Sequence, residues 1–248
     1  MNINRANISV AGESNIGTSR SHNEDNFLIV EPPGGDAVLC AIADGIGGHG
    51  HGEIASRICI RELGKAVMQY DSSSWDEKFL LDALNRANAR IFECNYAERR
   101  PRPMGCTVIA VIFTCDKLIT AFAGDSRLYE YDPDKKEPLR QLSTDHRPRR
   151  QEGRFYGLKD ELSNFVCRSL GTQKHVVVEQ RTFPRAAQAH YLLCSDGLYS
   201  AVPDQMLAGM LNSGLPVRKM TGRLMCEALL GGAKDNITLI CAGSREDK

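Results

Sequence analysis

The chain has 248 residues, of which 42% are hydrophobic and 25% charged, and its formal net charge is zero. These values are ordinary for a soluble globular protein, and they give no electrostatic reason to expect a nucleic acid or an acidic membrane as partner. The N-terminal segment MNINRANISV lacks the apolar core of a signal peptide, and no window approaches the roughly 20 apolar residues that span a bilayer. We therefore expect a soluble cytoplasmic protein.

The nine cysteines do not indicate a disulfide framework or a zinc ribbon, because none of them forms a C-x-x-C pair. Cys40, Cys194 and Cys241 lie inside apolar runs. This placement is typical of buried free thiols in a reducing compartment.

In chain order, apolar runs and helical patterns come in blocks. A run at 37–43 predicts a strand, and helical patterns follow over 51–70 and 76–98, the second with Ser74 as its expected N-cap. Further strands are expected at 107–113, 118–123, 128–132, 191–194 and 237–242, and further helix within 203–230. Segregated runs of this kind favour an α+β fold with antiparallel sheets flanked by helices. No change in composition divides the chain, so we expect one domain over 1–248.

Acidic residues recur where these predicted strands end. Asp44 follows CAIA, Asp125 follows AFAG and Asp196 follows LLCS, while Asp235 directly precedes NITLICA and 23-NED-25 precedes FLIV. A single acid in such a place usually forms a turn or caps a helix. Several carboxylates brought together would repel each other unless cations neutralised them, and oxygen ligands favour hard ions such as Mg²⁺ or Mn²⁺.

The segment AIADGIGGHGHGE adds glycines to one of these acids, since five of the eight residues after Asp44 are glycine. Glycine adds no packing and costs conformational entropy. We interpret these glycines as clearing space for backbone near a metal centre.

Two other chemistries fit less well. The segment 49-HGHGE-53 is similar to the H-x-H-x-D-H zinc motif of metallo-β-lactamase-like hydrolases, but Ile54 stands where the last histidine belongs. A cysteine phosphatase needs a glycine-rich C-x5-R loop, and the pair at that spacing, Cys94 and Arg100, has no glycine between its members. His49 and His51 are therefore interpreted as residues of a turn before a helix.

The complete set of motifs resembles the metal-dependent serine/threonine protein phosphatases (PPM, or type 2C) in their bacterial form. The motifs are 17-GTSRSHNED-25, 43-ADGIGGHGHGE-53, 105-GCT-107, 124-GDSR-127, 144-TDH-146, 194-CSDGL-198 and 235-DNIT-238. They occur in the family's order and span about residues 9–242. The resemblance implies a four-layer αββα sandwich of two antiparallel sheets flanked by helices.

The resemblance also implies roles for individual residues. Asp44, Asp196 and Asp235 would bind a pair of Mn²⁺ or Mg²⁺ ions, with the Gly45 carbonyl as a further ligand. Glu24 and Asp25 would act through metal-bound water, Asp125 would belong to a third, weakly bound ion, and Arg20 would hold the substrate phosphate. Such a pair of ions activates a water for in-line attack on phosphorus, and a guanidinium matches phosphate geometry.

Three positions depart from the family pattern. Ile46 stands where eukaryotic members carry a histidine proposed as the leaving-group acid, and Ser200 stands where an acid usually completes the third metal site. The basic segment 147–154 stands where members of the family usually have a mostly apolar helix.

The implied function is hydrolysis of phosphoserine and phosphothreonine in proteins, in opposition to a serine/threonine kinase, by a monomer in the cytoplasm. The alternative is a non-catalytic, phosphoprotein-binding pseudophosphatase. Such a descendant is expected to have lost one of Asp44, Asp196 or Asp235, and all three are present. The sequence therefore favours the enzyme.

Overall fold

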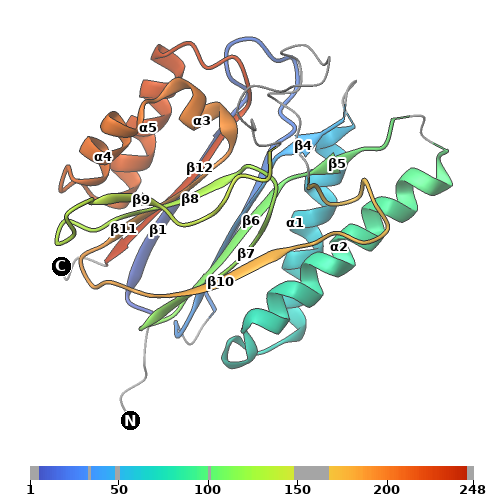
Figure 1. Ribbon diagram of the computed structural model, residues 1–248, viewed down its shortest axis with the longest axis horizontal. Coiled ribbons are helices and arrows are strands. Elements are labelled where there is room, and N and C mark those ends of the chain that lie inside the picture. Colours follow the sequence, from blue (N-terminus) through green and yellow to red (C-terminus); the bar gives the residue numbers. More distant parts are fainter. Residues whose placement is uncertain (1–5, 33–34, 48–50, 100–101, 148–167, 245–248) are drawn as a thin grey trace, which may run out of the picture.

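Two antiparallel sheets stack on each other between two layers of helices (Figure 1). The structure is a computed structural model, and it describes all residues except 1–5, 33–34, 48–50, 100–101, 148–167 and 245–248. This arrangement confirms the αββα sandwich expected from the sequence.

The first sheet has the strand order β1-β12-β11-β8-β9 and the second has the order β10-β7-β6-β3-β2. The strands of the first are β1 (Ile8–Asn15), β12 (Ile237–Ser244), β11 (His190–Cys194), β8 (Arg127–Tyr131) and β9 (Leu139–Gln141). Those of the second are β10 (Glu179–Pro184), β7 (Lys117–Ala123), β6 (Val108–Phe113), β3 (Val38–Ala43) and β2 (Asn26–Val30). The short strands β4 (Gly45–Ile46) and β5 (Gly105–Cys106) pair with each other beyond the ends of β3 and β6.

The helices form the two outer layers. α1 (Gly52–Gln69) and α2 (Glu77–Ala97) cover the second sheet, while α3 (Asp196–Ala201), α4 (Asp204–Leu211) and α5 (Val217–Leu230) cover the first. Residues of β3 and β6 are buried along their whole length, because both faces of these central strands are covered. Continuous apolar runs are typical of strands in such positions.

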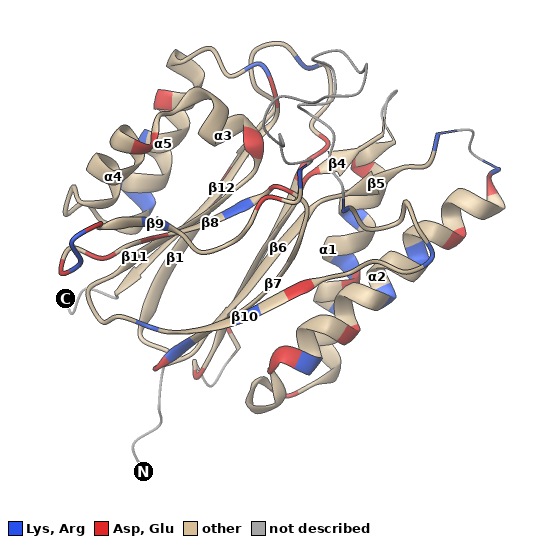
Figure 2. Ribbon diagram, in the orientation of Figure 1, with Lys and Arg blue, Asp and Glu red and all other residues tan. Residues whose placement is uncertain are grey.

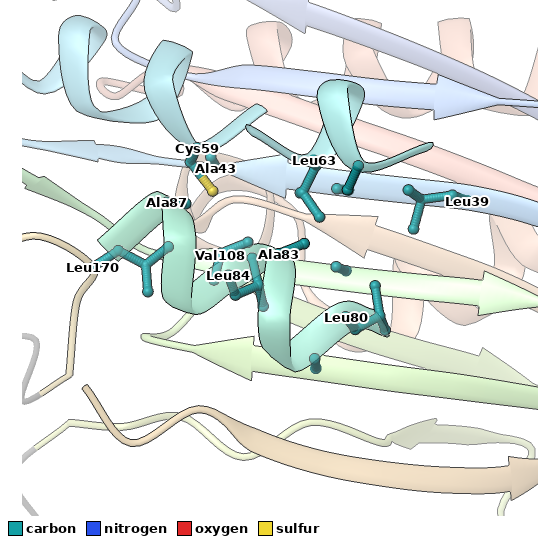
Figure 3. Close-up of a cluster of buried hydrophobic side chains, with 14 of the residues drawn as sticks. Leu39, Ala43, Cys59, Leu63, Leu80, Ala83, Leu84, Ala87, Val108 and Leu170 are labelled. Atoms are coloured by element: carbon teal, nitrogen blue, oxygen red, sulfur yellow. The ribbon is translucent and has the colours of Figure 1, made fainter. Parts of the chain in front are cut away.

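Three apolar clusters hold the layers together. One lies between the sheets, where Phe113 of β6 packs against Tyr191 of β11. A second joins α3, α4 and α5 to the first sheet. The third joins α1 and α2 to the second sheet, and Figure 3 shows Leu63 and Leu84 among its side chains. Burial of apolar area in these clusters is the main force that fixes the sandwich.

The apolar runs located most of the central strands, but two features differ from expectation. Strands β1 and β10 were not predicted, because their residues are mostly half-buried or exposed and form no apolar run. The predicted cap Ser74 is wrong. Ser72–Ser74 form a 3₁₀ turn, and Asp76 caps α2 by accepting a hydrogen bond from the Phe79 amide at 2.8 Å.

The thiol prediction is confirmed over the described residues, where every cysteine is free and Cys40, Cys194 and Cys241 are buried. Within the same part of the chain, none of the helices combines the length and the apolar character that a bilayer crossing requires.

The cap of α2 gives a test of the local structure. Asp76→Ala should lower the free energy of unfolding by about 1 kcal/mol, because the Phe79 amide loses its acceptor. Ser74→Ala is the control, since Ser74 is exposed and should leave the free energy unchanged. Urea denaturation measures both, and a larger loss in Ser74→Ala would contradict the assignment.

Candidate active site

The strand-end acids meet at one end of the sandwich, where they surround an open cavity of about 1590 Å³. Figure 2 shows acidic and basic segments gathered there, near β4 and the start of α3. The residues that line the cavity include seven that were predicted from the sequence: Arg20, Glu24, Asp44, Gly45, Asp125, Asp196 and Asp235. Strands of both sheets deliver these residues, because alternate connections of an antiparallel sheet lie at the same end.

Asp44 stands between β3 and β4, and Thr107 holds its backbone from both sides. The Thr107 amide donates to the Asp44 carbonyl at 2.8 Å, and the Asp44 amide donates to the Thr107 hydroxyl at 3.3 Å. The same hydroxyl lies 2.7 Å from that of Ser126. The 105-GCT-107 motif therefore fixes the direction in which the Asp44 carboxylate leaves the sheet.

Asp25 is a buried electrostatic neighbour of this carboxylate. Its Oδ2 accepts a hydrogen bond from the Ser195 hydroxyl at 2.8 Å, while its Oδ1 has no hydrogen-bond partner among the described residues. Buried polar atoms almost always have a partner, so this oxygen is free for a ligand or a bound water.

Burial and mutual repulsion disfavour the charged forms of these acids. Burial raises the pKa of Asp44 well above its usual range, and Asp25 and Asp196 raise it further. Burial, followed by the charges of Asp125 and Asp235, raises the pKa of Asp196 to about 7. Bound cations would reverse these shifts, because an opposite charge favours the ionised carboxylate.

The glycines after Asp44 have a specific steric role. A Cβ on Gly45 would lie 2.4 Å from the carbonyl carbon of Gly52, and a Cβ on Gly52 would lie 2.9 Å from Oε2 of Glu24. The Gly52 amide donates to Oε1 of Glu24 at 3.2 Å. The two glycines thus let the start of α1 approach β4 and the carboxylate of Glu24.

Two arginines supply positive charge to the acids. Arg20 Nη2 lies 2.6 Å from Asp235 Oδ2, and the Arg20 side chain is 53% exposed. Arg147 contacts both Asp125 and Asp196. Over the described residues, no three acidic, histidine or cysteine side chains already stand together as a set of ligands for one ion.

The residues present nevertheless suit a pair of hard cations. Asp44, Asp196 and Asp235 offer carboxylate oxygens around one cavity, and burial together with mutual repulsion raises the pKa of Asp44 and of Asp196. Among the described residues, Asp25 Oδ1 has no hydrogen-bond partner. Oxygen ligands of this kind are those that Mg²⁺ and Mn²⁺ prefer. The zinc alternative gains no support, since His51 lies in the turn before α1 and His49 is outside the described residues.

Some residues of the site were not singled out from the sequence. The side chain of Asn236 accepts from the Glu24 amide at 2.9 Å and donates to the carbonyls of Ile16 and His22. It thereby ties the loop that carries Arg20 to the start of β12. The signal that could have identified Asn236 is its position directly after Asp235. Arg147 was also missed as a residue of the site, because its contacts join segments too far apart in sequence to be read from a motif.

Comparison with known proteins gives the family. The model of the protein phosphatase 2C family matches residues 11–225. The serine/threonine phosphatase stp of Listeria monocytogenes is 29% identical over 233 residues, which cover 90% of this chain and 91% of that protein. The serine/threonine protein phosphatase PstP of Mycobacterium tuberculosis is 34% identical over 238 residues, covering 94% of this chain and 44% of PstP.

Solved structures agree with this assignment. The catalytic domain of PstP in complex with two manganese ions superposes with a TM-score of 0.75 at 28% identity, covering 95% of this chain and 97% of that one. PppA, a regulatory component of the type VI secretion system in Pseudomonas aeruginosa, superposes with a TM-score of 0.79 at 25% identity, covering 96% and 97%. The chain belongs to the protein phosphatase 2C family, which confirms both the family and the enzyme class predicted from its motifs.

The contact between Gly45 and Gly52 can be tested with a matched pair of substitutions in α1. Gly52→Ala should lower the free energy of unfolding by about 1–3 kcal/mol, because the new Cβ would overlap Gly45 and Glu24. Gly64→Ala meets nothing within 4 Å and should raise it by about 0.5–1 kcal/mol. Equal effects of the two substitutions in urea denaturation would refute this role of the glycines.

Proposed function

We propose that this protein hydrolyses phosphoserine and phosphothreonine in other proteins with the help of two Mn²⁺ or Mg²⁺ ions. The observation that carries the proposal is the set of mutually repelling carboxylates around one open cavity, together with a buried Asp25 oxygen that has no hydrogen-bond partner in the described part of the chain. The names of the relatives and the two manganese ions of PstP support the same function.

Each acid has a proposed role toward the ions. Asp44, Asp196, Asp235 and the carbonyl of Gly45 would hold the pair, and Glu24 and Asp25 would act through bound water. Two such ions, when bound, would lower the pKa of a bound water and screen the phosphoryl oxygens of the substrate. Ser195 keeps Asp25 oriented through its 2.8 Å hydrogen bond, and Thr107 holds the backbone of Asp44 beside the cavity.

Arg20 would bind the phosphate of the substrate. Its side chain is half exposed and lines the cavity, so the guanidinium can reach a phosphate without a movement of the backbone. Thr18 anchors this loop through two bonds to the Ala233 carbonyl, one from its amide and one from its hydroxyl, each of 2.9 Å. A guanidinium forms paired hydrogen bonds to phosphate oxygens, and these bonds strengthen as charge develops.

The alternative, a pseudophosphatase that binds phosphoproteins without turnover, is disfavoured by the site itself. The three core acids are present and line the same cavity. The proposal also includes an opposing serine/threonine kinase, action as a monomer in the cytoplasm, and a single phosphatase domain over 1–248. The pairing of β1 with β12, which joins distant parts of the chain in one sheet, supports the single domain.

Metal dependence is the direct test of the function. Phosphate release from a phosphothreonine peptide should stop in EDTA and return with Mn²⁺ or Mg²⁺. Asp44→Asn should lower kcat by about 100-fold or more, because it removes a ligand and a charge. Asp82→Asn, on the exposed side of α2, is the control and should behave like the wild type. Full turnover in EDTA would contradict the proposed function.

A second test concerns Arg20. Arg20→Ala should raise KM for phosphopeptides by about 10–100-fold, since charged hydrogen bonds to the phosphate are lost. Arg20→Lys should restore part of the loss, because lysine keeps the charge without the planar fork. Arg90→Ala removes a similarly exposed, ion-paired arginine from α2 and should change nothing. Unchanged kinetics in Arg20→Ala would instead assign Arg20 a structural role.

A further inference from the structure

A second arginine lies inside the cavity, between two of its acids. Arg147 Nε and Nη2 lie 2.6 and 2.5 Å from Oδ2 of Asp125, and Nη2 also lies 3.4 Å from Oδ2 of Asp196. In the sequence, Arg147 is the first residue of the basic segment 147–154. Its guanidinium instead lies beside Asp125 and Asp196, the two acids that the family resemblance assigns to a third metal ion.

The position of this guanidinium is built by the surrounding fold. Arg147 Nη2 donates to the Tyr199 hydroxyl at 3.1 Å, and that hydroxyl donates to the Asp125 carbonyl at 3.1 Å. The Tyr199 ring is covered by the guanidinium of Arg127, 3.6 Å from the ring centroid, and Arg127 itself pairs with Asp145. Residues of two further elements, Arg127 of β8 and Tyr199 of α3, thus hold the groups that Arg147 contacts.

This contact differs from the pairing of Arg20 with Asp235. The Arg147 side chain is 26% exposed and contacts Asp125, Asp196 and Tyr199, whereas that of Arg20 is 53% exposed and pairs with Asp235. Asp125 is 4% exposed, so its charge requires a partner close by. Arg147 meets this requirement with a hydrogen bond from Nε and an ion pair from Nη2, both to Oδ2 of Asp125.

Little uncompensated negative charge remains beside Asp125 and Asp196 to bind a divalent ion. Ser200, which lines the same cavity, is neutral where an acid would add a charge. Asp125 is already paired, and Asp196 is shared with the proposed metal pair. An additional divalent cation here would stand beside a fixed positive guanidinium, and like charges at such distances repel strongly.

We propose that Arg147 is the resident cation of this position, so that the protein neutralises Asp125 with its own side chain and binds two metal ions rather than three. Arg147 is then a positioning residue, which holds Asp196 toward the metal pair through Nη2. The inference rests on the proposed function only in that Asp196 serves that pair. The residues here do not suit a third ion, which revises the role that the resemblance gave to Asp125.

The test is calorimetric titration of the metal-free, full-length protein with Mn²⁺. The wild type and Ser200→Asp should each bind two ions, because Arg147 still fills the position. Arg147→Gln combined with Ser200→Asp should add a third binding event that is absent from the titration of Ser200→Asp. Arg147→Lys combined with Ser200→Asp is the matched control and should not add it, because the positive charge remains.

A second measurement does not depend on metal. The Tm of metal-free Arg147→Gln should fall by about 5 °C or more, since the buried Asp125 loses its partner. Arg90→Gln, which breaks an exposed ion pair with Glu93 on α2, is the control for simple loss of an arginine and should leave the Tm unchanged.

The outcomes separate this inference from the proposed function. A third ion in the wild type or in Ser200→Asp would overturn it, as would a third ion in the lysine control. If Arg147→Gln fails to fold, the Ser200→Asp titration still decides. Failure of the wild type to bind any Mn²⁺ would overturn the proposed function instead.

Discussion

The structure depends on the confinement of like charges. Acids that follow or precede buried strands are carried to one end of the sandwich, where burial removes most of the water that would screen them. The cost of such an arrangement is large unless positive charge and hydrogen bonds compensate for it. Arg20, Arg147 and the hydroxyl of Ser195 supply part of that compensation from the protein itself. The repulsion that remains is the source of the site's affinity for cations.

The sandwich makes this confinement possible because its two sheets are held rigidly. Close packing between them, as at Phe113 and Tyr191, prevents the ends of the strands from moving apart to relieve the repulsion. The contact between Gly45 and Gly52 acts in the same sense, because it brings α1 against the edge of the site and aims an amide at Glu24. The stability of the apolar layers therefore supports the strain at the site.

The sequence predicted what local patterns encode. Runs of apolar residues located β3, β6, β7 and β12, and the acids beside them located Asp44 and Asp196. Strands β1 and β10 escaped prediction because they are partly exposed and owe their form to pairing with a neighbour. The cap of α2 was placed two residues too early, since serine and aspartate both cap helices and only geometry chooses between them. The position of Arg147 depends on contacts across 22 and 49 residues, which no local pattern carries.

The pairing of β1 with β12 has a consequence for synthesis. Ser14 and Thr238, which share a hydrogen bond in this ladder, are 224 residues apart in the chain. Contacts between such distant residues form late, and they reduce the rate of folding. A chain emerging from the ribosome holds Asp44 and Asp125 long before Asp196 and Asp235 have been made, and it lacks the strand that would bring them into place. The acids of the site can therefore come together only after β12 has been made and has paired with β1 and β11.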